Sequence, residues 1–155
     1  MNQRLHDLFK YEEGKLFWRV SRGRINVGDE AGTIGQIGRM YVQVDKKKHL
    51  VHRVIWFLHH NEVPEFLDHI DGNPLNNKIE NLRPATKAQN AMNRKIRSDN
   101  STGFKGIYPT ASKRFAATIC IDGVSKYLGT YDTPEMAQAA YVQASKQNFK
   151  EYARV

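Results

Sequence analysis

The hydrophobic positions of this chain change period along its length, which predicts short helices alternating with short strands. Apolar residues recur at helical spacing over residues 3–10, and again in a helix that follows residue 51 and ends at Pro64. Other segments are short, rich in β-branched and aromatic residues, and bounded by turn residues, as strands are. In this part of the chain they are residues 16–20, 40–44, 66–69 and 81–83.

Capping residues predict where two later helices begin. Thr86 with Gln89 three residues on matches a capping box, in which the two side chains bond reciprocally to backbone N–H groups. Thr133 and Pro134 suit the N-cap and the first position of a last helix. The apolar stripe of that helix consists mostly of small residues, so the helix can lie close to a sheet.

Between those helices the sequence predicts three strands, at residues 104–109, 114–121 and 124–128. Asp122-Gly123 between the last two is a strong hairpin signal. Because side chains alternate along a strand, the middle strand should turn one set toward the helix and leave the other set open. The helix-facing set is Phe115, Ala117 and Ile119, and the open set is Arg114, Ala116 and Thr118.

The 155 residues suffice for one ordinary domain or two small ones. With 24 Lys and Arg against 16 Asp and Glu, the formal net charge of +8 favours a polyanionic partner, although charge alone leaves a merely solvated surface equally open. No apolar run approaches the roughly 20 residues of a membrane span, and the first residues lack the apolar core of a secretory signal. The single Cys120 excludes an internal disulfide and a multi-cysteine zinc site, and favours a reducing cytoplasm.

Residues 68–90 combine side chains that a nuclease could use. An imidazole ordinarily titrates near neutrality, so His69 is a natural general base for a water. Asp68 and Asn90 offer a carboxylate and an amide oxygen, an all-oxygen set that suits Mg²⁺ when waters and substrate phosphate complete the shell. Adjacent strand residues point to opposite faces, so Asp68 and His69 converge only if the strand ends or bends there.

An ordinary loop is the alternative interpretation, because residues 71–77 consist largely of typical turn residues. A calcium-binding loop is excluded. Its third ligand position counted from Asp68 falls on Ile70, and its fifth counted from Asp71 falls on Leu75.

The segment from His52 to Asn93 resembles the HNH endonucleases of phage and intron origin, a branch of the ββα-metal nucleases. His69, Asn81 and Asn90 occupy the places of the three motif residues, and Asp68 matches the carboxylate that precedes the histidine. The resemblance implies that His69 activates water, and that Asp68 and Asn90 hold one divalent ion. It also implies that Asn81 holds the hairpin loop through backbone hydrogen bonds and keeps His69 oriented. Asparagine rather than histidine at the third place favours Mg²⁺ or Mn²⁺ over zinc.

Basic residues near this motif are candidates for DNA contacts. Arg53 also recurs in the resembling family and could contact a phosphate, the alternative being a helix-surface arginine. Arg83 could touch the scissile phosphate or pair with Glu80. Further positive charge follows the motif at Arg94, Lys95 and Arg97.

Residues 103–149 are similar to the plant APETALA-type DNA-binding domain. The matching segments are Gly106-Ile107, residues 114–119, residues 127–133 and residues 139–141. The likeness implies that a three-stranded sheet lies in the major groove with a helix behind it. Candidate DNA contacts on or beside the open face are Lys105, Tyr108, Lys113, Arg114, Thr118, Lys126 and Tyr127.

Cys120, Ser125 and Tyr127 stand where the plant domains have arginines and a tryptophan, so their detailed specificity is not carried over. A small module that only stabilises the nuclease is the alternative.

These observations predict an α+β protein with a ββα-metal (His-Me finger) nuclease domain and a small three-stranded antiparallel sheet packed on one helix. The nuclease domain is expected at residues 1–97 with its core motif at 52–93, the linker at 98–102, and the DNA-binding domain at 103–155. Removal of residues 98–155 is expected to lose affinity or selectivity more than chemistry.

We expect a monomeric, site-preferring, homing-type endonuclease that cuts double-stranded DNA into 5′-phosphate and 3′-hydroxyl ends. It would use one Mg²⁺ or Mn²⁺ per active site, with no small-molecule cofactor and no membrane, in the cytoplasm of a bacterial host if phage-encoded. One alternative is a sequence-specific DNA-binding regulator whose nuclease domain is an inactive scaffold. Another is an RNA-directed nuclease, which is disfavoured because the A-form major groove is too narrow for a sheet.

Overall fold

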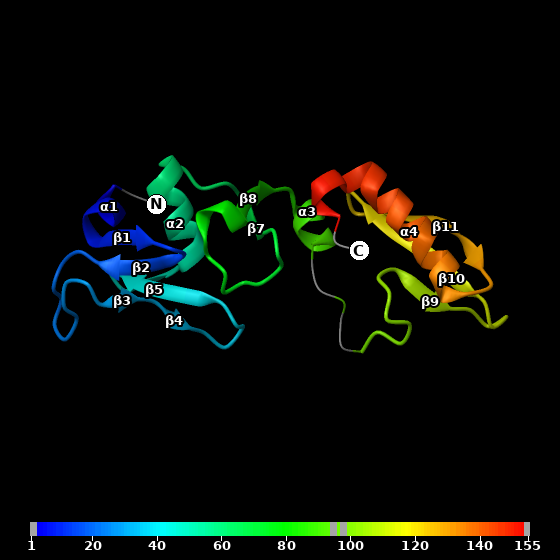
Figure 1. The fold of residues 1–155 in the computed structure, drawn as a ribbon, viewed down its shortest axis with the longest axis horizontal. Helices are drawn as coiled ribbons and strands as arrows, with labels where there is room; N and C mark the ends of the chain where they lie inside the picture. Colours follow the sequence, from blue (N-terminus) through cyan, green and yellow to red (C-terminus); the bar gives the residue numbers. More distant parts are fainter. Residues whose placement is uncertain (1–2, 94–95, 97–98, 154–155) are drawn as a thin grey trace. The chain divides into compact units, whose positions relative to one another are not determined.

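The computed structural model describes residues 3–93, 96 and 99–153. By its contacts the chain divides into two units, Met1–Ala85 and Thr86–Val155, called here the first and the second unit. Figure 1 shows the helices and strands of both. Small antiparallel sheets and short helices make up each unit, so the protein is of mixed α and β structure.

The first unit contains two three-stranded sheets, one two-stranded sheet and a central helix. The first sheet has the order β1-β2-β3, the second the order β4-β5-β6, and β7 pairs with β8. The elements are α1 (Arg4–Leu8), β1 (Phe9–Glu12), β2 (Lys15–Trp18), β3 (Glu30–Ala31), β4 (Thr33–Ile34), β5 (Met40–Val44), β6 (Lys47–Leu50), α2 (Val51–His60), β7 (Phe66–His69), the 3-10 helix η1 (Ile79–Asn81) and β8 (Leu82–Ala85).

Helix α2 forms the centre of the core of this unit. Val51, Val54 and Ile55 lie three and four residues apart on one face and are fully buried against the sheets. The helix ends earlier than predicted, because Asn61 takes the left-handed conformation at its C-cap, with φ of 58°, three residues before Pro64. This core fixes the platform from which β7 departs.

Local periodicity misjudged the start of the chain. The helix predicted over residues 3–10 ends at Leu8, because Phe9 pairs with Trp18 and begins β1. The short strands β3 and β4 were not predicted, since each has only two residues. The strand at 66–69 is confirmed by β7, whereas the strand predicted at 81–83 is η1 followed by β8.

The second unit is a three-stranded antiparallel sheet of order β11-β10-β9 with one long helix packed on it. The predicted hairpin at Asp122-Gly123 and the helix start at Thr133-Pro134 are both confirmed. The elements are α3 (Lys87–Met92), β9 (Ile107–Pro109), β10 (Phe115–Ile121), β11 (Val124–Tyr131), α4 (Pro134–Phe149) and the 3-10 helix η2 (Lys150–Tyr152).

The middle strand β10 departs from simple alternation. A bulge after Ala117 pairs that residue with Gly129 but Thr118 with Tyr127. Ala117 and Ile119 enter the core as predicted, but Ala116, predicted on the open face, is only 3% exposed. Ala116 is a small residue of the central strand between Tyr108 and Thr130, so its larger neighbours leave it little exposed surface.

Gly106 allows β9 to approach β10 and α4. Its φ is +66°, and a Cβ there would lie 2.2 Å from the Thr118 carbonyl oxygen and 2.6 Å from the Tyr141 ring. Only glycine fits this position without displacing the backbone.

Helix α3 packs in the core of the second unit. Met92 is buried there with Ile107 and Tyr141, the Tyr141 hydroxyl donates to Met92 Sδ at 3.9 Å, and Lys105 Nζ donates to the Met92 carbonyl at 2.8 Å. The contacts therefore separate between Ala85 and Thr86, earlier in the chain than the predicted linker at 98–102. The functional domain limits stay a prediction. Within the described residues, none of the helices combines the length and apolarity needed to cross a membrane.

Candidate active site

Strands β7 and β8 and the segment between them contain three of the four predicted motif residues. Their pairing is regular to its end, with Asp68 opposite Arg83 and His69 opposite Leu82. His69 is the last residue of β7. The strand therefore ends at this point, which is one of the two conditions under which Asp68 and His69 could converge. Both Asp68 and His69 are buried, although they are neighbours in one strand.

The imidazole of His69 lies in a polar, enclosed environment. It is 7% exposed, and its Nε2 lies 3.0 Å from Asn77 Oδ1. Burial lowers the pKa of His69 from its ordinary value of 6.5, against an opposing effect of the Asn77 hydrogen bond. Arg39 lowers this pKa further, while the carboxylates of Asp71 and Asp68 raise it. The balance keeps the ring neutral at pH 7, the form that can accept a proton.

A second histidine packs against the first. The ring of His52, on α2, meets that of His69 edge to face, with 5.0 Å between their centroids. Burial is the main cause that lowers the pKa of His52 to about 3, and His69, Arg39 and Arg53 act in the same direction. His52 is therefore an uncharged packing partner at neutral pH.

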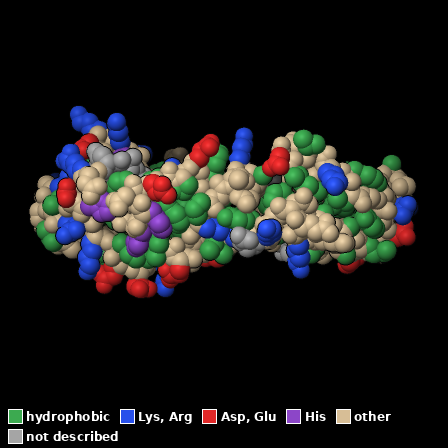
Figure 2. All heavy atoms as spheres, turned by 90° about the horizontal axis from the view of Figure 1, so that it is seen from above, with side chains coloured by type: hydrophobic (Ala, Val, Ile, Leu, Met, Phe, Trp, Pro, Cys, Tyr) green, Lys and Arg blue, Asp and Glu red, His purple; other side chains and the backbone are tan. Residues whose placement is uncertain are grey.

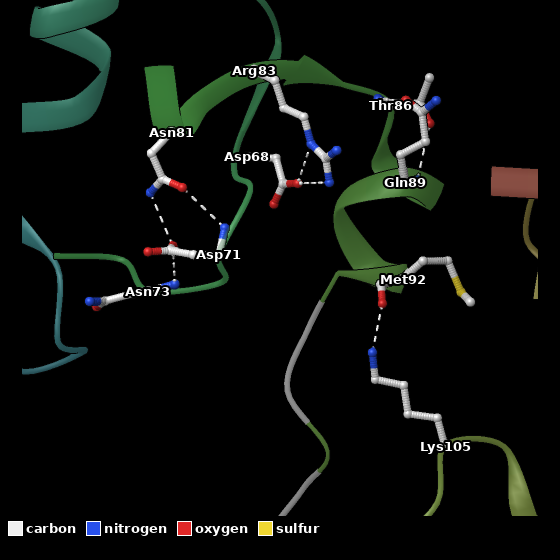
Figure 3. Close-up of polar contacts among 9 residues, drawn as sticks. All are labelled: Asp68, Asp71, Asn73, Asn81, Arg83, Thr86, Gln89, Met92 and Lys105. Atoms are coloured by element: carbon white, nitrogen blue, oxygen red, sulfur yellow. Dashed lines mark hydrogen bonds and ion pairs between the residues drawn. The ribbon is translucent and has the colours of Figure 1, made fainter. Parts of the chain in front are cut away.

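Asn81 holds the loop between β7 and η1. Its Nδ2 donates to Asp71 Oδ1 at 3.0 Å and to the Asn76 carbonyl at 2.7 Å, and its Oδ1 accepts from the Asp71 backbone N–H at 3.1 Å. Asp71 also accepts from the Asn73 backbone N–H at 2.7 Å (Figure 3). Burial raises the pKa of Asp71, but the hydrogen bonds from Asn73, Asn76 and Asn81 outweigh it and lower the pKa overall. These are the loop contacts that the resemblance implied for Asn81, while its part in catalysis stays a prediction.

Asp68 forms a buried ion pair across the hairpin. Arg83 Nε and Nη2 each lie 3.1 Å from Asp68 Oδ2, and the two side chains are 12% and 5% exposed (Figure 3). Within the protein Arg83 pairs with Asp68 and not with Glu80, the protein partner that the sequence suggested, while its contact with a DNA phosphate stays a prediction. Residues directly opposite in an antiparallel pair share one face, which explains the contact.

Asn90 lies on α3, in the second unit. The predicted capping box is present, with the Gln89 backbone N–H donating to Thr86 Oγ1 at 3.2 Å and the Thr86 N–H donating to Gln89 Oε1 at 2.7 Å (Figure 3). The backbone N–H of Asn90 bonds to the Thr86 carbonyl at 2.9 Å, and the residue is half-buried. The cap thus fixes the first turn of the helix that contains the predicted metal ligand.

Some of the predicted DNA contacts bond to other groups of the protein, whereas others are exposed. Arg53 donates to the carbonyls of Pro64 and Glu65 at 3.0 and 3.2 Å, and Lys105 bonds to α3 as described. Arg114 pairs with Asp132 at 2.8 Å. Lys113, Lys126, Tyr108 and Tyr127 are exposed, and Thr118 is half-buried. Arg94, Lys95 and Arg97 lie outside the described residues. All of them stay predictions as DNA contacts.

Charge on the surface is mixed. On the face shown in Figure 2, the Lys and Arg side chains of the described residues are spread among acidic and uncharged ones. A net charge of +8 therefore does not by itself locate a DNA-binding face.

Two side chains of the site were missed in the sequence. Asn77 read as a turn residue, yet it is 1% exposed and contacts His69. His52 was named only as the first residue of the family-like segment, yet its ring packs on that of His69. The usable signal was the apolar spacing of α2, which turns position 52 inward with Val51 and Ile55.

Metal donors in the described part of the chain are sparse. Nowhere within it do three or more His, Cys, Asp or Glu side chains form a group that could hold a metal ion. Asp68 belongs to the first unit and Asn90 to the second, and their service as ligands of one cation stays a prediction. Each offers oxygen, whereas structural zinc sites are built from nitrogen and sulfur.

Comparison with known proteins gives one family match and two similar proteins. The HNH endonuclease family matches residues 49–92. The chain is 30% identical over 93 residues to Protein 3.8 of Escherichia phage T7, a match covering 58% of this chain and 77% of that protein. It is 31% identical over 115 residues to an uncharacterized HNH endonuclease of Acanthamoeba polyphaga mimivirus, covering 72% of this chain and 59% of that protein. No solved structure matches the chain. The family match ends at residue 92, so the likeness of the C-terminal segment to the plant domain rests on its sequence alone.

Proposed function

The chain belongs to the HNH endonuclease family, and we propose that it is a metal-dependent DNA endonuclease with His69 as its general base. One observation supports this most: a buried imidazole with a lowered pKa ends strand β7, and the residue before it is a buried carboxylate that is ion-paired with Arg83. A hairpin that only packs would not need a buried imidazole. Nor would it need a buried carboxylate, because a buried charge costs stability unless it is paired.

The proposed chemistry is hydrolysis of a phosphodiester. His69 accepts a proton from a water, the oxygen of that water bonds to phosphorus, and the bond from phosphorus to the 3′ oxygen breaks. The 3′ oxygen takes a proton from solvent, which leaves a 3′-hydroxyl and a 5′-phosphate. Asn81 keeps the loop beside His69 in one conformation through its three hydrogen bonds.

Asp68 and Asn90 remain the proposed metal ligands. A bound Mg²⁺ or Mn²⁺ would supply charge stabilisation for the phosphate and the leaving oxygen. Arg83 already pairs with Asp68, so a metal ion and the guanidinium would share one carboxylate. With so few protein ligands, the affinity for metal should be low until DNA phosphate adds its oxygens.

The sheet β9–β11 is the proposed DNA-binding surface of the second unit. Tyr108 and Tyr127, 46% and 60% exposed, and Lys126 lie on these strands. Aromatic and basic groups on an open sheet fit the backbone and bases of a duplex groove. We propose that this surface gives the protein its site preference, as in a homing-type nuclease, and that one monomer acts.

The test is incubation with supercoiled plasmid DNA, with Mg²⁺ and with EDTA. We expect nicked or linear products only with Mg²⁺, and products that DNA ligase can reseal because the ends are 5′-phosphate and 3′-hydroxyl. Retention of DNA without cleavage at any metal concentration would instead establish the alternative, a DNA-binding regulator with an inactive nuclease scaffold. A parallel arm with duplex RNA decides the second alternative, since faster RNA cleavage would make the protein RNA-directed.

A further inference from the structure

Asn77 is the most enclosed polar side chain around His69. It lies between β7 and η1, in a segment whose composition predicts an exposed turn, yet it is 1% exposed. Its Oδ1 lies 3.0 Å from His69 Nε2, and its Nδ2 lies 3.6 Å from Met40 Sδ on β5. Full burial of an amide at a turn needs a reason, because an amide without bonding partners costs free energy.

The two contacts of Asn77 fix which way its amide points. The sulfur of Met40 has no hydrogen to give and accepts only weakly, so the amide nitrogen is the end that can face it. The amide oxygen must then face His69, and an amide oxygen can only accept a hydrogen bond. The hydrogen in the contact with Asn77 therefore belongs to His69 Nε2.

The surroundings hold Asn77 in this place from the N-terminal part of the unit. A side chain at Gly14, in the turn between β1 and β2, would meet the Asn77 backbone at 3.3 Å, so the two segments pack directly. Two residues on, the Ile79 backbone N–H donates to the Tyr11 hydroxyl at 3.1 Å. The position of Asn77 is thus set by β1, by the turn that follows β1 and by β5, all of which lie outside the hairpin that it serves.

We propose that Asn77 is a positioning residue that keeps His69 in the Nε2–H tautomer, so that Nδ1 bears the lone pair that accepts the proton from water. A neutral imidazole has one hydrogen on two nitrogens, and an acceptor at one nitrogen decides which of them has it. The edge-to-face packing of His52 at 5.0 Å limits rotation of the same ring. The catalytic part of this inference rests on the proposed role of His69 as the base.

The decisive experiment reads the hydrogen directly in the full-length protein without metal or DNA. Two-bond ¹H–¹⁵N correlation spectra at pH 7.5 distinguish the Nε2–H from the Nδ1–H tautomer, and His69→Gln identifies the His69 signals. We expect Nε2–H in the wild type. An Nδ1–H pattern for His69 would overturn the proposal before any variant of Asn77 is made.

Variants at Asn77 then test whether this side chain is the cause. Asn77→Leu keeps the size but removes the acceptor, so His69 should become a mixture of tautomers. Cleavage at saturating DNA should fall on the order of 100-fold while DNA affinity stays unchanged, by analogy with other bases held in the wrong tautomer. Asn77→Asp retains an acceptor oxygen and should keep Nε2–H and most of the activity. Asn148→Leu, an exposed position on α4, is the matched control.

The spectra also separate this inference from the wider proposal. An unchanged Nε2–H pattern in folded Asn77→Leu overturns the role of Asn77. If Asn77→Leu does not fold, an Nδ1–H pattern in Asn77→Asp overturns it as well. Full cleavage by His69→Gln, with Nε2–H intact in the wild type, would refute the general base and leave only the tautomer control standing.

Discussion

The candidate catalytic side chains of the first unit bond to one another and are buried, whereas the candidate DNA contacts of the second unit are largely exposed. Asp68 with Arg83 and His69 with Asn77 are two such buried pairs. In the second unit, the ion pair of Arg114 with Asp132 lies in solvent, and Tyr108 and Tyr127 are exposed. The hairpin is therefore organised before DNA arrives, as a catalytic site must be, while an exposed sheet can adapt to its ligand.

One motif residue belongs to the second unit rather than the first. Asn90, the fourth motif residue, lies on α3, and Met92 of the same helix is buried in the core of the second unit. We infer that the base is set by the first unit and the helix with the proposed metal ligand by the second. The expectation that loss of residues 98–155 lowers affinity or selectivity more than chemistry stays a prediction, and the packing of Met92 adds that the same loss removes the core around α3.

The largest predicted effect is on stability, and it distinguishes the buried ion pair of Arg83 from the exposed ion pair of Arg114. Arg83→Met leaves the buried carboxylate of Asp68 without its countercharge, and should lower the free energy of unfolding by about 3–5 kcal/mol. Arg114→Met removes the exposed pair with Asp132 and should cost at most about 1 kcal/mol. Urea unfolding of both variants and the wild type measures the difference. Equal losses would contradict the distinction between a buried and an exposed pair.

The same pair tests the sharing of Asp68 with a metal. In Arg83→Met, millimolar Mg²⁺ should restore part of the lost stability, because a cation replaces the guanidinium. The ion should have little effect on Arg114→Met. If Mg²⁺ leaves both melting temperatures unchanged, Asp68 is not a metal ligand in the free protein.

The next effect concerns helix α3. Met92→Ala removes a buried side chain from the core of the second unit and should cost about 2–4 kcal/mol. Met136→Ala, at a residue that is 52% exposed, should be nearly neutral. We also expect Met92→Ala to reduce cleavage at saturating DNA, because α3 loses its support. Wild-type cleavage by Met92→Ala, despite its lower stability, would show that α3 does not depend on the packing of Met92 in the second unit.

A third effect concerns the histidines of the first unit. With a pKa of about 3 in the folded protein, His52 stays neutral where the unfolded chain, with an ordinary value of 6.5, binds a proton. The unfolded state thus gains protons first as the pH falls below 6.5, and stability is lost in that window. At pH 5 the loss should reach roughly 2 kcal/mol relative to pH 7. His52→Phe should show a smaller loss over the same range, measured by urea unfolding at several pH values.

The smallest effect is expected on the surface of the second unit. If Lys126 contacts a phosphate, Lys126→Ala should weaken DNA binding and lower the slope of log affinity against log salt by about 1. Lys10→Ala, at an exposed lysine of the first unit, is the control. An unchanged slope in Lys126→Ala would remove that residue from the proposed interface.

Sequence alone located the elements whose signals are local. The capping box at Thr86 and Gln89, the hairpin at Asp122-Gly123 and the strand at 66–69 follow from neighbouring residues, and each is confirmed. The two-residue strands β3 and β4 are too short to show an alternating pattern, and they are strands only through their pairing with β2 and β5. The bulge in β10 beside Ala116 likewise depends on the pairing of β10 with β11, so no local pattern predicts it.

The site was predictable in its residue types but not in its connections. Asp68 and His69 were found because their chemistry is unusual for a turn. Arg83 was given the wrong protein partner, because its cross-strand position depends on the register of β7 with β8. Asn77 was overlooked because Met40, which orients it, is 37 residues away in the sequence.

The measurement that tests the account most directly is single-turnover cleavage of plasmid DNA in Mg²⁺ by the wild type and His69→Ala, with DNA retention measured on the same samples. His60→Ala, at an exposed histidine of α2, is the matched control. The account predicts that His69→Ala binds DNA as the wild type does and cuts it about 100- to 10,000-fold more slowly, while His60→Ala cuts normally. Wild-type cleavage by His69→Ala would contradict it.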